Sequence, residues 1–145
     1  KRKTQIYNDK INSTFIPPRE GVLDVLEYAY KNKIKIGFVT STTLDNIDAV
    51  FKTLNNQIKK NHFDFIGNNS QIKEPKPAPD IYIKALNSLE LKPLECIAIE
   101  DTVESALSAD RAKIKCIAFP GLFHVDDDFS FCVKKLDKLN TSIFN

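Results

Sequence analysis

The sequence predicts an α/β fold, in which a doubly wound parallel sheet forms the middle of three layers and helices cover both of its faces. Two observations predict it. Short apolar runs alternate along the chain with segments whose apolar residues recur at helical spacing. Polar groups follow several of these runs, and the clearest run, residues 95–101, ends in the adjacent carboxylates of Glu100 and Asp101. Such a run is typical of a buried strand in a parallel sheet.

Length and composition indicate one globular domain. The chain has 145 residues, of which 42% are hydrophobic and 28% are charged. A net charge of +2 gives no reason to expect nucleic acid as a partner, and no apolar run approaches the roughly 18 residues of a membrane span. The three cysteines lack C-x-x-C spacing, which predicts reduced, buried thiols in a reducing compartment. They are Cys96, Cys116 and Cys132.

The first half of the chain begins with a polar segment and continues into alternating elements. The stripe of apolar residues in 1–12 suits a short amphipathic helix, and Pro17-Pro18 indicates a linker. Helical spacing predicts a helix over 20–32, and an apolar run predicts a strand over 34–39 that stops at Thr40. A second amphipathic helix follows, with Thr43 or Asp45 placed to cap it.

The second half repeats the alternation around a proline-rich segment. We expect a strand over 63–66, a loop over 67–71, and then an extended, stiff segment over 73–80, because three prolines occupy alternate positions there. A helix should run to about Glu90, with Tyr82 among its inward-facing residues. After the strand that ends at Asp101, the pattern predicts a further helix and then two strands. These strands are expected over 114–119 and 131–133.

Polar groups that suit a phosphate site follow three of the predicted strands. They are Thr40-Ser41, the segment that carries Lys76, and Glu100-Asp101. Right-handed crossovers bring such strand ends to one edge of the sheet, where ligands bind. A lysine and backbone amides neutralise phosphate oxygens, and carboxylates suit Mg²⁺. The sequence therefore predicts a magnesium-assisted phosphate site at this edge.

These motifs resemble the haloacid dehalogenase (HAD) superfamily of aspartate-nucleophile phosphatases. Thr40, which follows Gly37-Phe38-Val39, is similar to that family's second motif; Lys76-Pro77-Ala78-Pro79-Asp80 is similar to the third, and Glu100-Asp101-Thr102 to the fourth. Softer motifs resemble the CbbY and β-phosphoglucomutase branch of the family. They are Lys3-Thr4-Gln5-Ile6-Tyr7, Pro17-Pro18-Arg19-Glu20-Gly21-Val22, Thr40-Ser41-Thr42-Thr43 and Asp127-Asp128-Phe129-Ser130.

The resemblance implies hydrolysis of a small phosphorylated sugar, such as a sugar bisphosphate, in two steps. An aspartate attacks the phosphate, and water then cleaves the aspartyl-phosphate. In this chain, Thr40, Lys76 and Asp101 would be catalytic, and Thr40, Ser41 and Lys76 would bind the substrate phosphate. Asp101 would bind Mg²⁺, with Glu100 a ligand directly or through water.

The family's first motif, Asp-x-Asp-x-Thr on its first strand, does not occur in this sequence. In the family that strand lies at the centre of the sheet, between the strand before Thr40 and the strand that ends at Glu100. The resemblance therefore implies that residues 1–16 are the end of a helical cap and a linker, and that residues 17–145 are a core without its first strand. We expect this chain to need a preceding segment, in the same or a separate chain, and to be inactive alone. The compartment would be cytoplasm or plastid stroma, and targeting information would lie upstream.

Each of these residues also has a structural interpretation. Thr40 could cap the next helix, Glu100 could serve as a partner for Lys76, and Lys76 could be a solvated loop lysine. Surface roles, among them a salt bridge for the arginine, suit Arg19, His124 and the acidic run 126–128. The chain departs from the family at Ser105 and Lys113, where glycine is usual; if Lys113 keeps a left-handed conformation at a helix end, it costs roughly 1–2 kcal/mol.

Three other functions remain open at this point. One is phosphoryl transfer of the β-phosphoglucomutase type, and another is a non-catalytic fragment or degenerate family member. A receiver-like or nucleotide-binding domain explains the alternation of strands and helices but not the Lys76 motif, and the chain has no glycine-rich phosphate loop.

Overall fold

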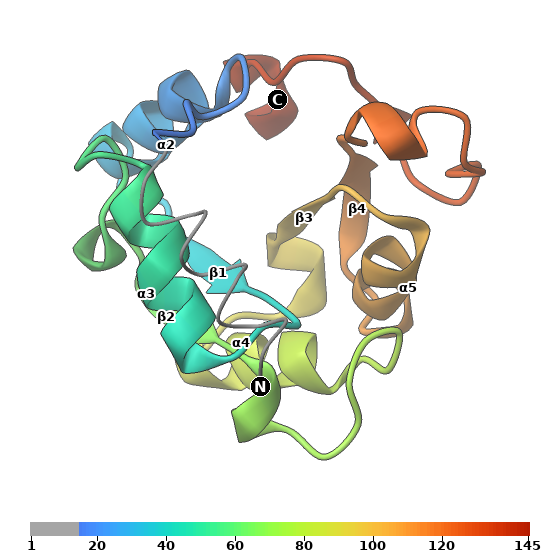
Figure 1. Ribbon diagram of the computed structural model, residues 1–145. Coiled ribbons are helices and arrows are strands. Elements are labelled where there is room, and N and C mark those ends of the chain that lie inside the picture. Colours follow the sequence, from blue (N-terminus) through green and yellow to red (C-terminus); the bar gives the residue numbers. More distant parts are fainter. Residues whose placement is uncertain (1–14) are drawn as a thin grey trace.

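Strands and helices alternate along residues 15–145, which are the part of the chain that the computed structural model describes (Figure 1). The predicted helix over 1–12 lies outside this part. The α-helices are α2 (Val22–Lys31), α3 (Leu44–Thr53), α4 (Asp80–Leu89) and α5 (Val103–Arg111). The strands are β1 (Gly37–Val39), β2 (Phe65–Gly67), β3 (Ile97–Glu100), β4 (Lys115–Ala118) and β5 (Lys134–Lys135). Short 3₁₀ turns cover Lys60–His62, Asn69–Gln71, Pro93–Glu95, Leu122–His124 and Thr141–Phe144.

The strands form two separate parallel sheets. β1 pairs with β2, with Phe38 opposite Ile66, and β3, β4 and β5 form the second sheet in that order, with Ala98 opposite Cys116. Within the described residues, no strand pairs with both β1 and β3, and Figure 1 shows these two strands apart. The prediction of an α/β parallel fold is confirmed. The break in the sheet lies where the resemblance places a missing strand.

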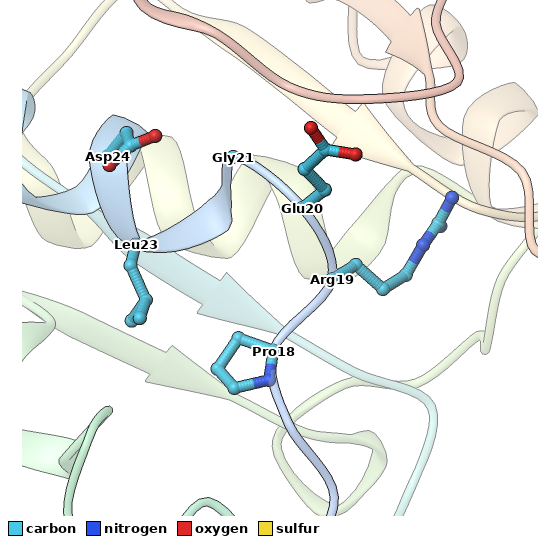
Figure 2. A pocket seen from close by; sticks show the side chains of 6 residues that line it. All are labelled: Pro18, Arg19, Glu20, Gly21, Leu23 and Asp24. Carbon is cyan, nitrogen blue, oxygen red and sulfur yellow. The ribbon is translucent and has the colours of Figure 1, made fainter.

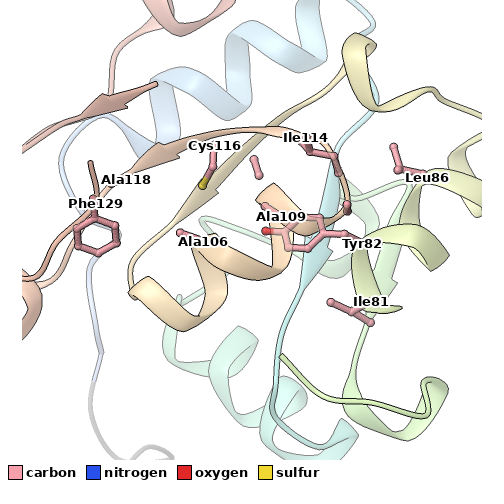
Figure 3. Close-up of a cluster of buried hydrophobic side chains, with 11 residues drawn as sticks. Ile81, Tyr82, Leu86, Ala106, Ala109, Ile114, Cys116, Ala118 and Phe129 are labelled. Atoms are coloured by element: carbon pink, nitrogen blue, oxygen red, sulfur yellow. The ribbon is translucent and has the colours of Figure 1, made fainter. Parts of the chain in front are cut away.

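Alternate residues of β3 and β4 face two different helical layers. Ala98 and Cys116 belong to a buried cluster with residues of α4 and α5, among them Tyr82 and Ala109 (Figure 3). The intervening residue Ile117 packs on the opposite face with α2 and the C-terminal turn, in a second cluster. This alternation follows from the pleat of a strand, which turns successive side chains to opposite faces. The three predicted layers are therefore present.

An apolar cavity of about 250 Å³, which we call the slot, lies on the α2 and α3 side of the two sheets. Its lining includes residues of β1 and β3 themselves. The lining residues are Val22, Val25, Leu26, Phe38, Val50, Phe51, Leu54, Ile58, Phe63, Ile99, Phe119 and Leu139. Unfilled apolar volume of this size is costly in a protein interior, because the lining atoms lose dispersion contacts.

Two strands begin later than predicted, because backbone amides of the predicted strand residues donate hydrogen bonds outside the sheet. β1 begins at Gly37 rather than at residue 34, since the Ile36 amide donates to the Asp64 carboxylate at 2.8 Å instead of to a neighbouring strand. The last strand is 134–135 rather than 131–133. The Cys132 amide donates to the Phe129 carbonyl at 2.9 Å, which keeps the predicted strand residues in a turn.

Several helix ends use left-handed residues, and Gly21 and Lys113 are two of them. Gly21 precedes α2 with φ +83°, and a Cβ placed there would lie 1.8 Å from the Leu139 carbonyl oxygen, so only glycine fits. Lys113, after α5, has φ +64°, so the condition stated above for this departure from the family's glycine is met.

All three cysteines are free thiols, but only Cys116 is buried, whereas Cys96 and Cys132 are half-buried. The prediction of buried thiols is therefore wrong for two of them, because both lie just outside the strands. In residues 15–145, no helix has the length and apolar character that crossing a membrane requires.

Candidate functional site

The polar groups that the sequence places at strand ends lie at the carboxyl ends of β1 and β3 and in the segment that leads into α4. Thr40 directly follows β1, and its amide donates to the Gly67 carbonyl at 3.0 Å, which extends the pairing of β1 with β2 by one residue. The Thr40 hydroxyl oxygen accepts the Thr42 amide at 3.2 Å, so it holds the turn after the strand rather than capping α3. Ser41 is exposed on this turn.

Lys76 and Glu100 form a buried ion pair that joins the segment before α4 to the end of β3. The Lys76 ammonium donates to Oε1 of Glu100 at 2.6 Å, and their side chains are 4% and 9% exposed. The interpretation of Lys76 as a solvated loop lysine is therefore wrong, and the expected contact with Glu100 is present. Charged groups are rarely left buried unless they are paired, so this geometry fixes both side chains.

Tyr82 is a member of this site that the sequence analysis placed only as an inward-facing residue. Its hydroxyl donates to Oε1 of Glu100, the same oxygen that accepts the Lys76 ammonium. Burial, followed by the negative charge of Glu100, raises the pKa of Tyr82 well above its usual value of 10. The signal available in the sequence was a tyrosine on the apolar face of a helix, because a buried tyrosine hydroxyl needs a partner.

Hydrogen bonds from α5 hold the segment that carries Lys76. The Ser108 hydroxyl, which is fully buried, donates to the Ala78 carbonyl at 2.6 Å, and the Arg111 guanidinium donates to the Pro77 carbonyl at 2.9 Å. The three prolines of the segment leave few amides for local pairing, so its carbonyls bond to side chains instead. α5 thus helps to place Lys76.

The second acidic residue of the pair differs from the first. Asp101 is exposed, and no hydrogen bond or ion pair reaches its side chain from residues 15–145. The next residue, Thr102, caps α5, and its hydroxyl oxygen accepts the Ser105 amide at 3.2 Å. Glu100 therefore faces inward and Asp101 outward, although they are neighbours in sequence, because successive residues at a strand end point to opposite sides.

The donor set for a divalent cation is partial within the described residues. No three His, Cys, Asp or Glu side chains gather there. Asp101 and Oε2 of Glu100 have no hydrogen-bond donor from residues 15–145, and both are of the oxygen type that Mg²⁺ takes. Mg²⁺ often uses only one or two carboxylates and completes its shell with water and phosphate, so these two residues fit part of such a site.

Arg19 and His124 have hydrogen-bond partners other than the residues of the Lys76–Glu100 pair. The Arg19 guanidinium, whose side chain extends away from the start of α2 (Figure 2), donates to the carbonyls of Phe119 and Pro120 at 2.6 and 2.8 Å and lies 3.4 Å from the Phe119 ring centroid. The expected salt bridge of Arg19 is therefore wrong, because carbonyls and an aromatic face satisfy it. His124 lies 2.7 Å from a carboxylate oxygen of Asp127 in an exposed turn.

Comparison with known proteins identifies relatives of this chain. The family model described as haloacid dehalogenase-like hydrolase matches residues 1–119. Protein CbbY of Rhodobacter capsulatus is 32% identical over 130 residues, which are 90% of this chain and 57% of the relative. Protein CbbY of Cereibacter sphaeroides is 30% identical over 119 residues, which are 82% of this chain and 52% of the relative. The chain thus spans little more than half the length of these curated relatives.

Solved structures agree with this assignment. A crystal structure of CbbY from Rhodobacter sphaeroides in complex with xylulose-1,5-bisphosphate has a TM-score of 0.87 and 29% identity, and the match covers 94% of this chain and 60% of that one. β-Phosphoglucomutase from Clostridium difficile has a TM-score of 0.76 at 22% identity over 99% of this chain and 60% of that one, which indicates a shared fold. The chain belongs to the haloacid dehalogenase-like hydrolase family, in the branch that contains the CbbY proteins.

Proposed function

We propose that this chain is the carboxy-terminal part of a Mg²⁺-dependent phosphatase that hydrolyses a small sugar phosphate or sugar bisphosphate through an aspartyl-phosphate. The observation that carries the proposal is the buried Lys76–Glu100 pair, which holds an ammonium group at the carboxyl end of β3. A cation fixed in this way costs no reorganisation when phosphate charge develops. The similarity to CbbY, whose crystal structure holds xylulose-1,5-bisphosphate, supports a sugar bisphosphate as substrate.

Each residue has a proposed role. The Lys76 ammonium would offset the charge on the phosphate oxygens during transfer, and the hydroxyl of Thr40 with the amide of Ser41 would bind those oxygens. Asp101, with Oε2 of Glu100 directly or through water, would hold Mg²⁺, which as a Lewis acid would neutralise phosphate charge. The hydrogen bond from the Thr42 amide to the Thr40 hydroxyl oxygen leaves the Thr40 hydroxyl proton available for donation to a phosphate.

The nucleophile is proposed to come from outside residues 1–145. An aspartate there would attack phosphorus and release the sugar alcohol, whose oxygen would take a proton from a second aspartate. Water would then add to the phosphorus of the aspartyl-phosphate, so that inorganic phosphate leaves and the carboxylate is restored.

The slot supports a preceding strand as the carrier of this aspartate. β1 and β3 both contribute to the lining of the slot and have no ladder between them in the described residues, and unpaired backbone is unfavourable away from water. An extended apolar segment between them would complete one parallel sheet and fill the cavity. Its carboxyl end would lie beside Thr40 and Lys76.

The test compares the chain alone with a fusion that carries the preceding segment of the longer protein. Phosphate release from sugar mono- and bisphosphates is measured with Mg²⁺ and with a chelator. We expect hydrolysis only by the fusion and only with Mg²⁺, and a loss of about 10²–10³-fold in kcat for Lys76→Met. The matched control Lys73→Met changes an exposed lysine of the same segment and should keep full activity.

Three outcomes would contradict the proposal. Hydrolysis by residues 1–145 alone would show that the nucleophile is internal. Conversion of one sugar phosphate to its isomer without phosphate release would favour the phosphomutase alternative. A folded fusion that does neither, for every sugar phosphate tried, would favour a non-catalytic role.

A further inference from the structure

Glu100 is held by two donors from one segment of the chain. Lys76 precedes α4, and Tyr82 lies in the first turn of that helix. Both residues donate to Oε1 of Glu100 at the end of β3. The Lys76 ammonium also lies 5.4 Å from the centroid of the Tyr82 ring. The three side chains therefore form one buried polar group, which we call the Lys–Glu–Tyr bridge.

The bridge connects parts of the fold that no strand ladder joins in the described residues. α4 packs on β1 and β2, whereas Glu100 belongs to the other sheet. Tyr82 reaches across because its ring lies in the cluster with Ala98 and Ala109, among residues of β3 and α5 (Figure 3). Its hydroxyl thus fixes the end of β3 relative to the segment that carries Lys76.

The pattern of donors makes the two oxygens of Glu100 unequal. Oε1 accepts both the ammonium and the phenol, whereas Oε2 accepts no hydrogen bond from residues 15–145. The Glu100 side chain as a whole keeps 9% of its surface exposed. Two donors on one oxygen restrict rotation of the carboxylate and set the direction of the other oxygen. An ammonium alone, on a flexible stem, would hold this direction less firmly.

We infer that Tyr82 is a positioning residue, whose hydroxyl orients the Glu100 carboxylate so that Oε1 holds Lys76 and Oε2 faces the site. The hydroxyl acts as a donor here, because its partner is a carboxylate oxygen, which accepts. The effect of Tyr82 on catalysis rests on the proposed function, whereas its effect on the orientation of Glu100 does not. The orientation itself can be measured in the chain alone.

The test uses Tyr82→Phe, which keeps the ring and removes the donor, in the 145-residue chain. Nuclear magnetic resonance relaxation of the Glu100 side-chain methylene groups reports their order parameters. We expect the order parameters of these methylene groups to be lower in Tyr82→Phe than in the unmodified chain, because only Lys76 then holds the carboxylate. The matched control Tyr30→Phe changes a tyrosine that is 77% exposed and should leave Glu100 rigid. An unchanged order parameter in folded Tyr82→Phe would overturn the inference, because the ring alone would then suffice.

A second measurement keeps the inference testable if Tyr82→Phe does not fold. Absorbance at alkaline pH follows ionisation of the tyrosines, and Glu100→Gln removes the negative charge beside Tyr82. We expect one tyrosine to ionise at lower pH in Glu100→Gln than in the unmodified chain. Identical titration curves would mean that the Tyr82–Glu100 contact does not exist.

In the fusion with the preceding segment, Tyr82→Phe should lower kcat with little change in KM, since the carboxylate is misplaced while phosphate binding by Thr40 and Ser41 remains. The two failures are distinguishable. An inactive unmodified fusion would refute the proposed function and leave the relaxation result standing. A rigid Glu100 in Tyr82→Phe would refute the positioning role and leave the function standing.

Discussion

Replacement of Lys76 by methionine should strongly destabilise the chain, because it strands a buried carboxylate. The ion pair is short, at 2.6 Å, and the side chains of Lys76 and Glu100 are 4% and 9% exposed. Removal of one partner of a buried pair typically costs about 3–5 kcal/mol, since the remaining charge loses its compensation without regaining water. Tyr82 still donates to Glu100 in this variant, so we expect a value near the lower limit, about 3 kcal/mol.

The double variant Lys76→Met/Glu100→Leu separates the stranded charge from the loss of packing. Burial of two charges is itself expensive, and apolar replacement of both partners is often neutral or stabilising. Tyr82 would then lose its acceptor, at a cost of about 1–3 kcal/mol. We therefore expect the double variant to be no less stable than Lys76→Met, with a coupling free energy of at least about 1.5 kcal/mol between the two positions.

Urea denaturation followed by circular dichroism measures the free energy of unfolding of the chain and its variants. The exposed control Lys73→Met should stay within about 0.5 kcal/mol of the unmodified chain. A loss below about 1 kcal/mol for Lys76→Met would refute the reasoning, because it would mean that the pair is open to water. Costs that simply add in the double variant would refute it as well, since the charges would then not interact.

Three further predictions concern stability. Gly21→Ala should cost more than about 2 kcal/mol in urea denaturation, because it combines a positive φ with contact against the Leu139 carbonyl, whereas Gly121→Ala, where nothing lies within 4 Å, should be nearly neutral. Thr102→Ala should lower the free energy of unfolding by about 0.5–2 kcal/mol, because it removes the cap of α5. Thr43→Ala changes an N-cap residue that makes no side-chain hydrogen bond and should cost less, and equal losses in the two variants would contradict this prediction. The pKa of Tyr82 is raised in the folded chain, so above about pH 10 the folded chain keeps a proton that the unfolded chain releases. The free energy of unfolding should therefore fall with rising pH by up to about 1.4 kcal/mol per pH unit. Denaturation at a series of pH values should show a smaller slope for Tyr82→Phe.

The sequence was sufficient to predict the features that follow from local pattern. Helical spacing predicted α2 and α4 nearly to the residue, and the apolar run before Glu100 predicted β3. The ends of β1 and β5 were not predictable in this way, because Asp64 and Phe129, distant or turn-forming partners, decide which amides enter the ladder. Strand length is settled by these hydrogen bonds, whereas apolar content determines only that a strand forms.

The sequence predicted which strand ends carry polar residues, but it did not predict the hydrogen bonds among those residues. Thr40, Lys76 and Glu100 could be assigned to one edge because parallel strands end together. Which of two adjacent carboxylates would turn inward to Lys76 depends on the face of β3 that meets α4 and α5, and neither residue type distinguishes them. Tyr82 was not assigned to the site, because its aromatic ring suits the core and the apolar pattern of the helix accounts for it without any role for its hydroxyl.

The separation of the two sheets gives the Lys–Glu–Tyr bridge its importance. In a continuous sheet, backbone hydrogen bonds fix the ends of neighbouring strands relative to one another. Here β1 and β3 have no such ladder in the described residues, and the side chains that line the slot beside them are all apolar. The contact of α4 with α5 and the bridge from Lys76 and Tyr82 to Glu100 therefore help to set the spacing of the carboxyl edge. A strand that entered the slot would meet an edge whose lysine and carboxylate are already in place.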